Sequence, residues 1–160
     1  MFDPQAEKER DFVDQIALVL ERSGLPPVAG RILGRLLICD PAEQSSSALA
    51  DYLNTSAGSV STSTRMLMQT GLVERVRKRG SRSAWFRVRE GAWAEMIHAE
   101  IARIRRLREV ADMGLALLPG DCPDERRRRM QDFRDFNAFF EREFPILIEH
   151  WDNREKKEET

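Results

Sequence analysis

Residues Ser45 to Arg89 read SSSALADYLNTSAGSVSTSTRMLMQTGLVERVRKRGSRSAWFRVR, and this stretch decides the fold. It places a short apolar helix, a turn and a hydroxyl-rich second helix ahead of two strand-like runs that flank a basic tip. This order is typical of a winged helix-turn-helix, in which the second helix enters the DNA major groove and a β-hairpin reaches the flanking backbone. The stretch therefore predicts duplex DNA as the partner.

Turn and cap signals set the boundaries of the two central helices. The first helix is expected around Ser46–Leu53, and Ser56 is a good N-cap for a second helix over Ala57–Thr70. Gly71 is the expected C-terminal stop of that second helix.

The second helix is predicted to be the recognition helix. Its expected inward residues are Ala57, Val60, Thr64, Leu67 and Met68, and its expected DNA contacts are Ser56, Ser59, Ser61, Thr62, Arg65 and Gln69. Hydroxyls can bind phosphate oxygens or base edges, and the Arg65 guanidinium can reach guanine or a phosphate. The alternative is a Ser/Thr-rich surface helix that binds nothing.

Two short runs, 72–76 and 84–88, are predicted to be the strands of the wing. The tip between them carries the predicted wing contacts Lys78, Arg79 and Arg82 around Gly80. An arginine on such a tip can enter the minor groove. A solvated basic loop without a ligand is the alternative.

Charge is segregated along the chain, although the net charge is only −1. Residues 55–90 hold eight basic side chains against two acidic ones, whereas residues 1–54 hold five against nine. A local basic face can bind phosphates while the acidic remainder limits nonspecific attraction.

The flanking segments are predicted to be helical and to form a dimer. Apolar residues at helical spacing, including Phe12, Ile16, Val19 and Leu20, predict a first helix over Glu7–Arg22, and a second follows at about Val28–Cys39. A long helix from Gly91 and a last helix from Pro123 carry further apolar stripes, and Pro145 should kink or restart the last one. The residues expected to pair with a second copy are Ile97, Ile101, Ile104, Phe133, Phe136 and Phe140. Packing within the chain is the alternative.

The expected fold class is mainly α with a small β-hairpin wing. The predicted organisation is an N-terminal dimerisation helix (1–24), the winged helix-turn-helix domain (25–90), long dimerisation helices (91–152) and a charged, frayed tail (153–160).

Two motifs resemble the MarR-like winged-helix transcriptional regulators, and their GbsR-type branch most closely. The first contains Pro26, Ala29, Gly30, Arg31, Ile32 and Gly34, and the second contains Ser56, Gly58, Ser59, Val60, Ser61 and Thr62. The resemblance covers about Leu25 to Arg89 and implies a homodimeric cytoplasmic regulator, usually a repressor, that binds a pseudo-palindrome. In the commonest pattern of this family an Asp precedes the wing Arg and braces it, whereas this chain has Ser81 before Arg82.

Regulators of this kind often bind an inducing small molecule where the winged domain joins the long helices. Trp85, Trp93, Met96 and His98 lie at that junction in the sequence, and plain core packing is the alternative role for them.

The remaining signals are weak. Cys39, Cys122 and the two histidines lack metal-site spacing, so no metal or cofactor is expected, and Cys122 is the better candidate for a redox-reactive thiol. The run Arg126–Arg129 indicates a solvated or salt-bridged face, with a second phosphate contact as the alternative.

No catalytic motif is present, so an enzyme is not expected. The amino end lacks the pattern of a signal peptide, which favours the cytoplasm. The rival function is a winged-helix module that joins proteins and binds no DNA.

Overall fold

The computed structural model describes residues 4–158, with side chains up to residue 153. The chain divides into two compact units, and the boundary falls after Ala92. Within the described range the structure has six helices and one three-stranded antiparallel sheet, which confirms the predicted fold class. No helix among these residues is long and apolar enough to cross a membrane.

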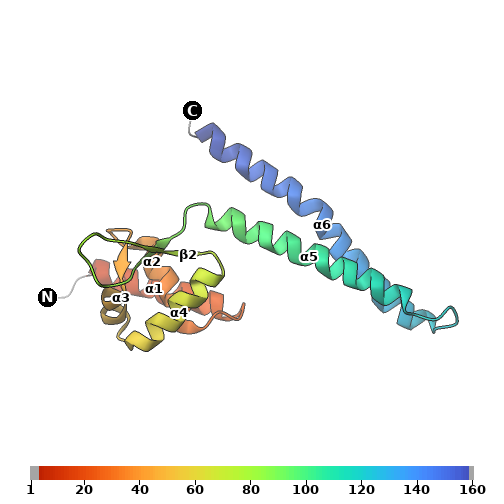
Figure 1. The fold of residues 1–160 in the computed structure, drawn as a ribbon, viewed down its shortest axis with the longest axis horizontal. Helices are drawn as coiled ribbons and strands as arrows, with labels where there is room; N and C mark the ends of the chain where they lie inside the picture. The colour runs from red at the N-terminus through yellow and green to blue at the C-terminus, as the bar shows by residue number, and fades with distance from the viewer. Residues whose placement is uncertain (1–3, 159–160) are drawn as a thin grey trace. The chain divides into compact units, whose positions relative to one another are not determined.

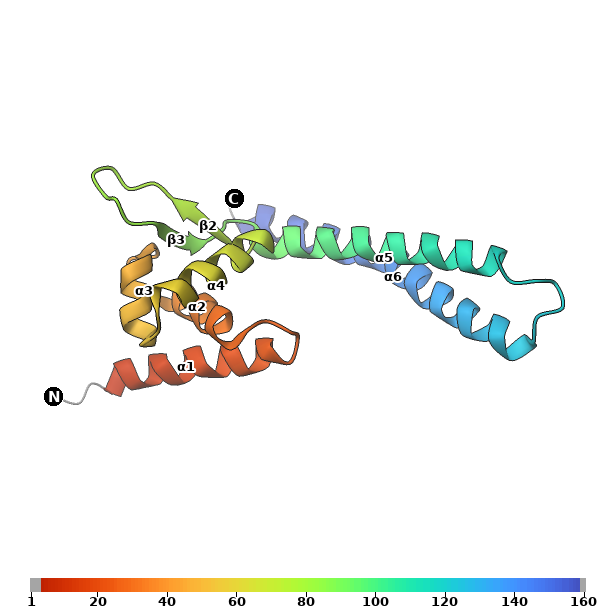
Figure 2. The ribbon, with the colours of Figure 1, turned by 60° about the horizontal axis from the view of Figure 1, so that its bottom comes forward.

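The first unit contains four helices and the sheet (Figure 1). The helices are α1 (Pro4–Glu21), α2 (Pro27–Ile38), α3 (Ser46–Leu53) and α4 (Ala57–Gln69), and the strands are β1 (Gln44–Ser45), β2 (Val73–Val76) and β3 (Trp85–Val88). The sheet order is β1-β3-β2, and Figure 2 shows the β2–β3 hairpin extending past α3 as a long loop. The core of this unit completely buries the apolar side chains of Val13, Ile32, Leu33, Leu49, Val60 and Leu67. The strand β1 was not predicted, because two residues show no periodicity.

A close helix crossing attaches α1 to α2. A Cβ added at Gly30 would lie 2.8 Å from the Ala17 Cα, and one at Gly34 would lie 3.1 Å from the Val13 Cα. Glycine at both positions therefore lets the two backbones approach closely. The Arg31–Asp14 and Arg35–Glu9 ion pairs, at 2.8 and 2.9 Å, flank this crossing.

Helix α1 is buried mainly through residues other than the apolar ones whose spacing predicted the helix. Val13 and Ala17 are the buried residues, whereas Phe12 is 38% and Val19 is 64% exposed. Small side chains occupy the crossing because the two backbones are too close for larger ones.

The second unit is an antiparallel helix pair of α5 (Ala92–Ala116), whose first residue lies at the boundary, and α6 (Asp124–Glu158) (Figures 1 and 2). Helix α6 continues through Pro145, so of the two outcomes expected there, a kink or a restart, the restart is wrong. Proline costs a helix one hydrogen bond, and α6 continues in spite of this loss. The backbone is helical up to Glu158, within the tail predicted to be frayed, and residues 159–160 lie outside the described range.

An ion-pair network joins the two helices of the second unit. The Nε atoms of Arg108 and Arg105 lie 2.6 and 3.1 Å from the carboxylate of Glu141. Asp112 accepts from Arg134 at 3.1 Å and from Arg108 at 2.5 Å. The hydrogen bond from Arg108 lowers the pKa of Glu141 below its ordinary value of 4.5. Hydrogen bonding from Arg134 likewise lowers the pKa of Asp112 below 3.8.

This network predicts an acid-dependent stability difference. A carboxyl group whose pKa is lowered by folding stabilises the fold above its ordinary pKa, and the gain disappears as the pH falls through the lowered value. We expect Glu141→Gln to lower the melting temperature at about pH 7, and the gap to close below about pH 4. Thermal unfolding followed by circular dichroism measures this gap, with Glu149→Gln on the same helix as the control. A gap of the same size at low and neutral pH would contradict the prediction.

Candidate nucleic-acid interface

Helix α4 is held by a capped start, a glycine stop and a buried stripe. The Ser56 hydroxyl accepts a hydrogen bond from the Ser59 N–H at 3.1 Å, and Gly71 follows the helix with φ +76°. Val60, Thr64 and Leu67 are almost completely buried, and the Thr64 hydroxyl donates to the Val60 carbonyl at 2.8 Å. The predicted cap, stop and central inward residues are therefore confirmed.

The opposite face of α4 presents polar side chains to solvent. Ser56, Ser61, Thr62, Arg65 and Gln69 are exposed. Ser59 is half-buried, with its hydroxyl oxygen 2.9 Å from that of Ser56. The inward orientation expected for Ala57 is wrong. Ala57 is exposed, because it precedes the turns of α4 that pack on the core. The exposed face is the one that a duplex can reach.

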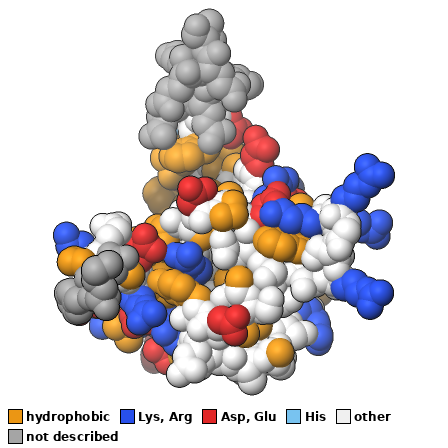
Figure 3. Space-filling model, turned by 90° about the vertical axis from the view of Figure 1, so that its left-hand side faces the viewer, with side chains coloured by type: hydrophobic (Ala, Val, Ile, Leu, Met, Phe, Trp, Pro, Cys, Tyr) orange, Lys and Arg blue, Asp and Glu red, His pale blue; other side chains and the backbone are white. Residues whose placement is uncertain are grey.

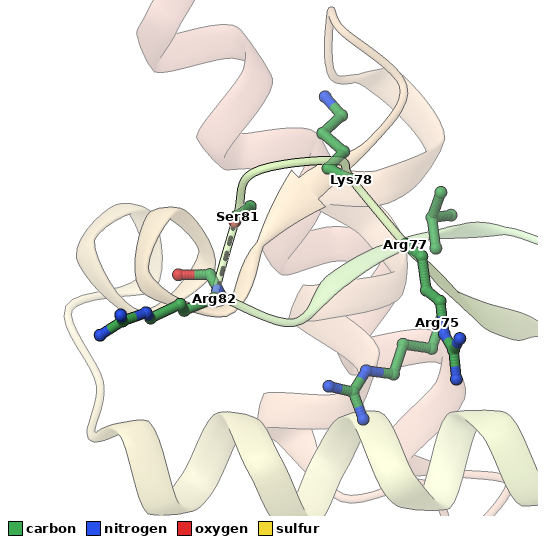
Figure 4. Close-up of a pocket in the computed structure, with 7 residues that line it drawn as sticks. Arg75, Arg77, Lys78, Ser81 and Arg82 are labelled. Carbon is green, nitrogen blue, oxygen red and sulfur yellow. Dashed lines mark hydrogen bonds between the residues drawn. The ribbon is translucent and has the colours of Figure 1, made fainter.

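Strand alternation separates the cationic side chains of the wing. Arg75 and Arg77 lie two residues apart and point to one side of the hairpin, and Lys78 points to the other (Figure 4). Arg75 pairs with the buried Phe86 across β2 and β3, so its side of the hairpin is the one that packs toward α4. Arg82 extends outward from the loop, away from Arg75, in this view.

Lys78 is paired within the protein, although 36% of its side chain is exposed. Its Nζ atom lies 3.1 Å from a Glu43 carboxylate oxygen and 3.9 Å from the centre of the Trp85 ring. Arg79 and Arg82, the other two predicted wing contacts, are exposed. Within the part of the chain that the structure describes, no ion pair is formed by Arg65, Arg75, Arg77, Arg79 or Arg82.

Two hollows lie in this part of the first unit. One, of about 240 Å³, lies between α4 and the sheet and is lined by residues that include Ser61, Arg65 and Arg75. The other, of about 350 Å³, lies at the wing and is lined by Arg75, Arg77, Lys78, Ser81 and Arg82 among others. Arg75 lines both hollows and so links Arg65 on α4 to the arginines of the wing.

Figure 3 shows Lys and Arg side chains projecting together from one edge of the face in view. Arg87 differs from the free arginines because its Nε donates to Glu74 at 2.6 Å across the strands, and this hydrogen bond raises its pKa.

Sequence reasoning missed Arg75 and Arg77 because the wing contacts were sought only at the loop tip. Strand alternation was the signal that could have found them, since both residues fall on one side of a run that extends β2.

The residues predicted to form a ligand pocket separate into three places. Trp93 and Met96 line an apolar hollow of about 340 Å³ between α5 and α6, together with Ile97, Phe144, Leu147, Ile148 and Trp151. Trp85 instead contacts Ser81 and Lys78 in the wing. His98 is exposed on α5 and does not line this hollow.

The residues predicted to form the dimer contact fall into a buried group and an exposed group. Ile101 and Ile104 are 8% and 6% exposed in a single copy of the chain, and Ile97 and Phe140 are half-buried. Phe133 and Phe136 are 43% and 63% exposed on α6. The two aromatic rings are therefore available to another protein surface, whereas the two isoleucines serve packing within one chain.

Neither cysteine is among the residues assigned to DNA contact. Cys122 is buried, and burial raises the pKa of the half-buried Cys39 thiol. Among the described residues, no group of three or more His, Cys, Asp or Glu side chains could hold a metal ion.

Comparison with known proteins identifies the family. A family model described as MmpR5-like MarR family transcriptional regulator matches residues 91–155. The HTH-type transcriptional regulator MmpR5 of Mycobacterium tuberculosis (strain ATCC 25618 / H37Rv) is 43% identical over 131 residues, which cover 82% of this chain and 79% of that protein. The chain belongs to the MarR family of transcriptional regulators.

A solved structure supports the assignment over nearly the whole chain. A crystal structure described only as a transcriptional regulator shares 38% identity with this MarR-family chain at a TM-score of 0.77. The match covers 91% of this chain and 99% of that one. The protein is therefore a DNA-binding transcriptional regulator and not an enzyme, and the rival role as a module without DNA binding is not favoured.

Proposed function

We propose that this MarR-family regulator is a repressor that binds a pseudo-palindromic operator as a homodimer and is released by a small apolar molecule. The observation that carries the proposal is that Arg75 lines one hollow with Arg65 of α4 and another with Arg77 and Arg82 of the wing, beside the exposed polar face of α4. A recognition helix reads base edges, and a basic wing neutralises phosphates beside it.

Each side chain has a proposed role on DNA. Arg65 lies among exposed hydroxyls on α4, so we assign it to the base edges of the major groove. Ser56, Ser59, Ser61, Thr62 and Gln69 are assigned to phosphates and base edges around it. Arg79 and Arg82 are assigned to the backbone or minor groove, joined by Arg75 and Arg77. Lys78 is assigned to the wing itself, because Glu43 already neutralises its charge.

A footprint tests the operator. Protection of DNA upstream of the protein's own coding region should show two half-sites with centres about 34 Å apart, one helical turn, because each recognition helix of a dimer occupies one major groove. Addition of the protein to transcription from that DNA should lower transcript yield. A single protected half-site at every protein concentration, or a raised yield, would contradict the proposal.

The exposed aromatic side chains of α6 support the homodimer. Phe133 and Phe136, with Phe139 at 49% exposure, form an apolar face that one copy leaves in contact with water. Contiguous apolar surface of this kind marks a protein interface. The exposed Phe12 and Val19 of α1 support the assignment of residues 1–24 to dimerisation.

Phe136→Asp is expected to turn the dimer into a monomer, because a desolvated carboxylate is costly in an apolar interface. Sedimentation velocity measures the mass, and operator affinity should fall about 100-fold because the two half-sites are no longer bound by linked modules. Met113→Asp is the matched control, since Met113 is 62% exposed on α5, is not among the residues assigned to the interface and should leave both properties unchanged. A Phe136→Asp protein that remains dimeric would contradict the assigned interface.

The effector and the location are inferred from separate observations. The lining of the α5–α6 hollow is entirely apolar or aromatic, which favours an apolar molecule, and Trp93 and Met96 would contact it. A regulator of promoters acts where the chromosome lies, so we infer a cytoplasmic protein. The motifs around Gly30 and Gly58 support a place near the GbsR-type branch.

A further inference from the structure

We propose that the Ser81 hydroxyl and the Trp85 indole, with Lys78 and Glu43, form a brace that holds the wing in the shape that binds DNA. This inference rests on the proposed use of the wing arginines. It gives Ser81 the positioning role of the Asp that precedes the wing Arg in the commonest pattern of the family, by different contacts.

The Ser81 hydroxyl closes the tip of the wing by accepting two hydrogen bonds. The Trp85 Nε1–H donates to it at 2.9 Å, and the Ser83 backbone N–H donates to it at 3.2 Å (Figure 4 shows the second bond). The Ser81 N–H in turn donates to the Lys78 carbonyl at 3.2 Å. These three bonds fix the loop on both sides of Gly80, which has φ +80°.

Trp85 connects this closed tip to the body of the first unit. It is the first residue of β3 and pairs with Val76 of β2 and with Ser45 of β1. Lys78 lies over its ring at 3.9 Å and reaches Glu43, next to β1, at 3.1 Å. The brace therefore runs from the loop to the sheet and to the segment before it.

The brace leaves Arg82 free of an acidic partner. A hydroxyl that accepts two hydrogen bonds still has its own proton to donate, and it carries no charge. An Asp at this position could accept the same two bonds, but its charge would lie beside Arg82 and beside an incoming phosphate. Ser81 therefore holds the loop without reducing the positive charge of the wing hollow, which Arg75, Arg77 and Arg82 line with it.

Removal of the hydroxyl tests the brace. We expect Ser81→Ala to lower operator affinity roughly fivefold, because one hydrogen bond to the indole is lost, and Ser81→Thr to restore it. Hydroxyl-radical footprinting should show that Ser81→Ala loses protection only at the outer flanks, where the wing binds, and keeps protection under α4. Ser83→Ala is the control, since it removes a neighbouring hydroxyl and leaves the Ser83 N–H in place.

A readout without DNA separates this inference from the proposed function. The Trp85 Nε1–H resonance, assigned by its loss in Trp85→Phe, should exchange with solvent roughly fivefold faster in Ser81→Ala than in wild type or Ser81→Thr. Unchanged exchange and an unchanged footprint in Ser81→Ala would overturn the brace. Faster exchange with wild-type DNA affinity and flank protection would also overturn it, because the brace would then not serve binding. A wild-type protein that protects no DNA would instead overturn the proposed function.

Discussion

Arg65→Ala is expected to lower affinity for the operator between tenfold and 100-fold and to change affinity for unrelated duplex less than about threefold. A side chain that pairs with a base edge supplies about 1–3 kcal/mol of discrimination, and about 1.4 kcal/mol corresponds to a factor of ten. Arg65 fits this role because it is exposed, forms no ion pair in the described structure and lines a hollow with Arg75. Fluorescence anisotropy with operator and scrambled duplexes measures both affinities.

Arg82→Ala provides the contrast, because a wing arginine on the backbone should weaken binding to every sequence alike. Arg106→Ala is the control, since this arginine is exposed on α5 and pairs with Glu109 at 3.0 Å. If Arg65→Ala lost affinity equally on operator and scrambled DNA, Arg65 would contact phosphates and not bases. If it lost affinity on neither, α4 would not be part of the DNA interface.

Gly30→Ala is expected to lower the free energy of unfolding by about 1–2 kcal/mol. Overpacking of a core costs about 1–3 kcal/mol, and the higher helix propensity of alanine returns up to about 1 kcal/mol. The added Cβ would lie 2.8 Å from the Ala17 Cα and 3.1 Å from its Cβ, so backbone would have to move. Urea unfolding followed by circular dichroism measures the change.

Gly58→Ala is the matched control for this prediction. Its added Cβ would meet only the Ser56 hydroxyl, at 3.8 Å, so the same substitution should leave stability unchanged or raise it by up to about 1 kcal/mol. If both variants were as stable as the wild type, α1 would not pack on α2 as closely as described.

The sequence predicted the elements of the first unit well because their boundaries have local chemical causes. Ser56 caps α4 and Gly71 follows its end, and apolar residues at helical spacing face the core between them. The recognition face could be predicted from the same periodicity. Neither prediction required knowledge of distant contacts.

The remaining features depended on contacts between distant segments. The buried face of α1 follows from the glycines of α2, which make Val13 and Ala17 better packing residues than Phe12 and Val19. The placement of Lys78 follows from Glu43, 35 residues earlier in the chain. Ile101 and Ile104 share the apolar stripe expected to pair with a second copy, but periodicity does not tell which apolar residues one chain buries by itself.

The salt dependence of operator binding, compared between wild type and an Arg77→Ala/Arg82→Ala double variant, tests most directly whether α4 and the wing form one phosphate-binding surface. Each neutralised phosphate contributes about 0.9 to the slope of log K against log salt. The wild-type affinity should fall steeply with salt, and the slope of the double variant should be smaller in magnitude by about 3 to 4, for two arginines in each of two protomers. Identical slopes for the two proteins, or a wild-type affinity that does not change with salt, would contradict the account.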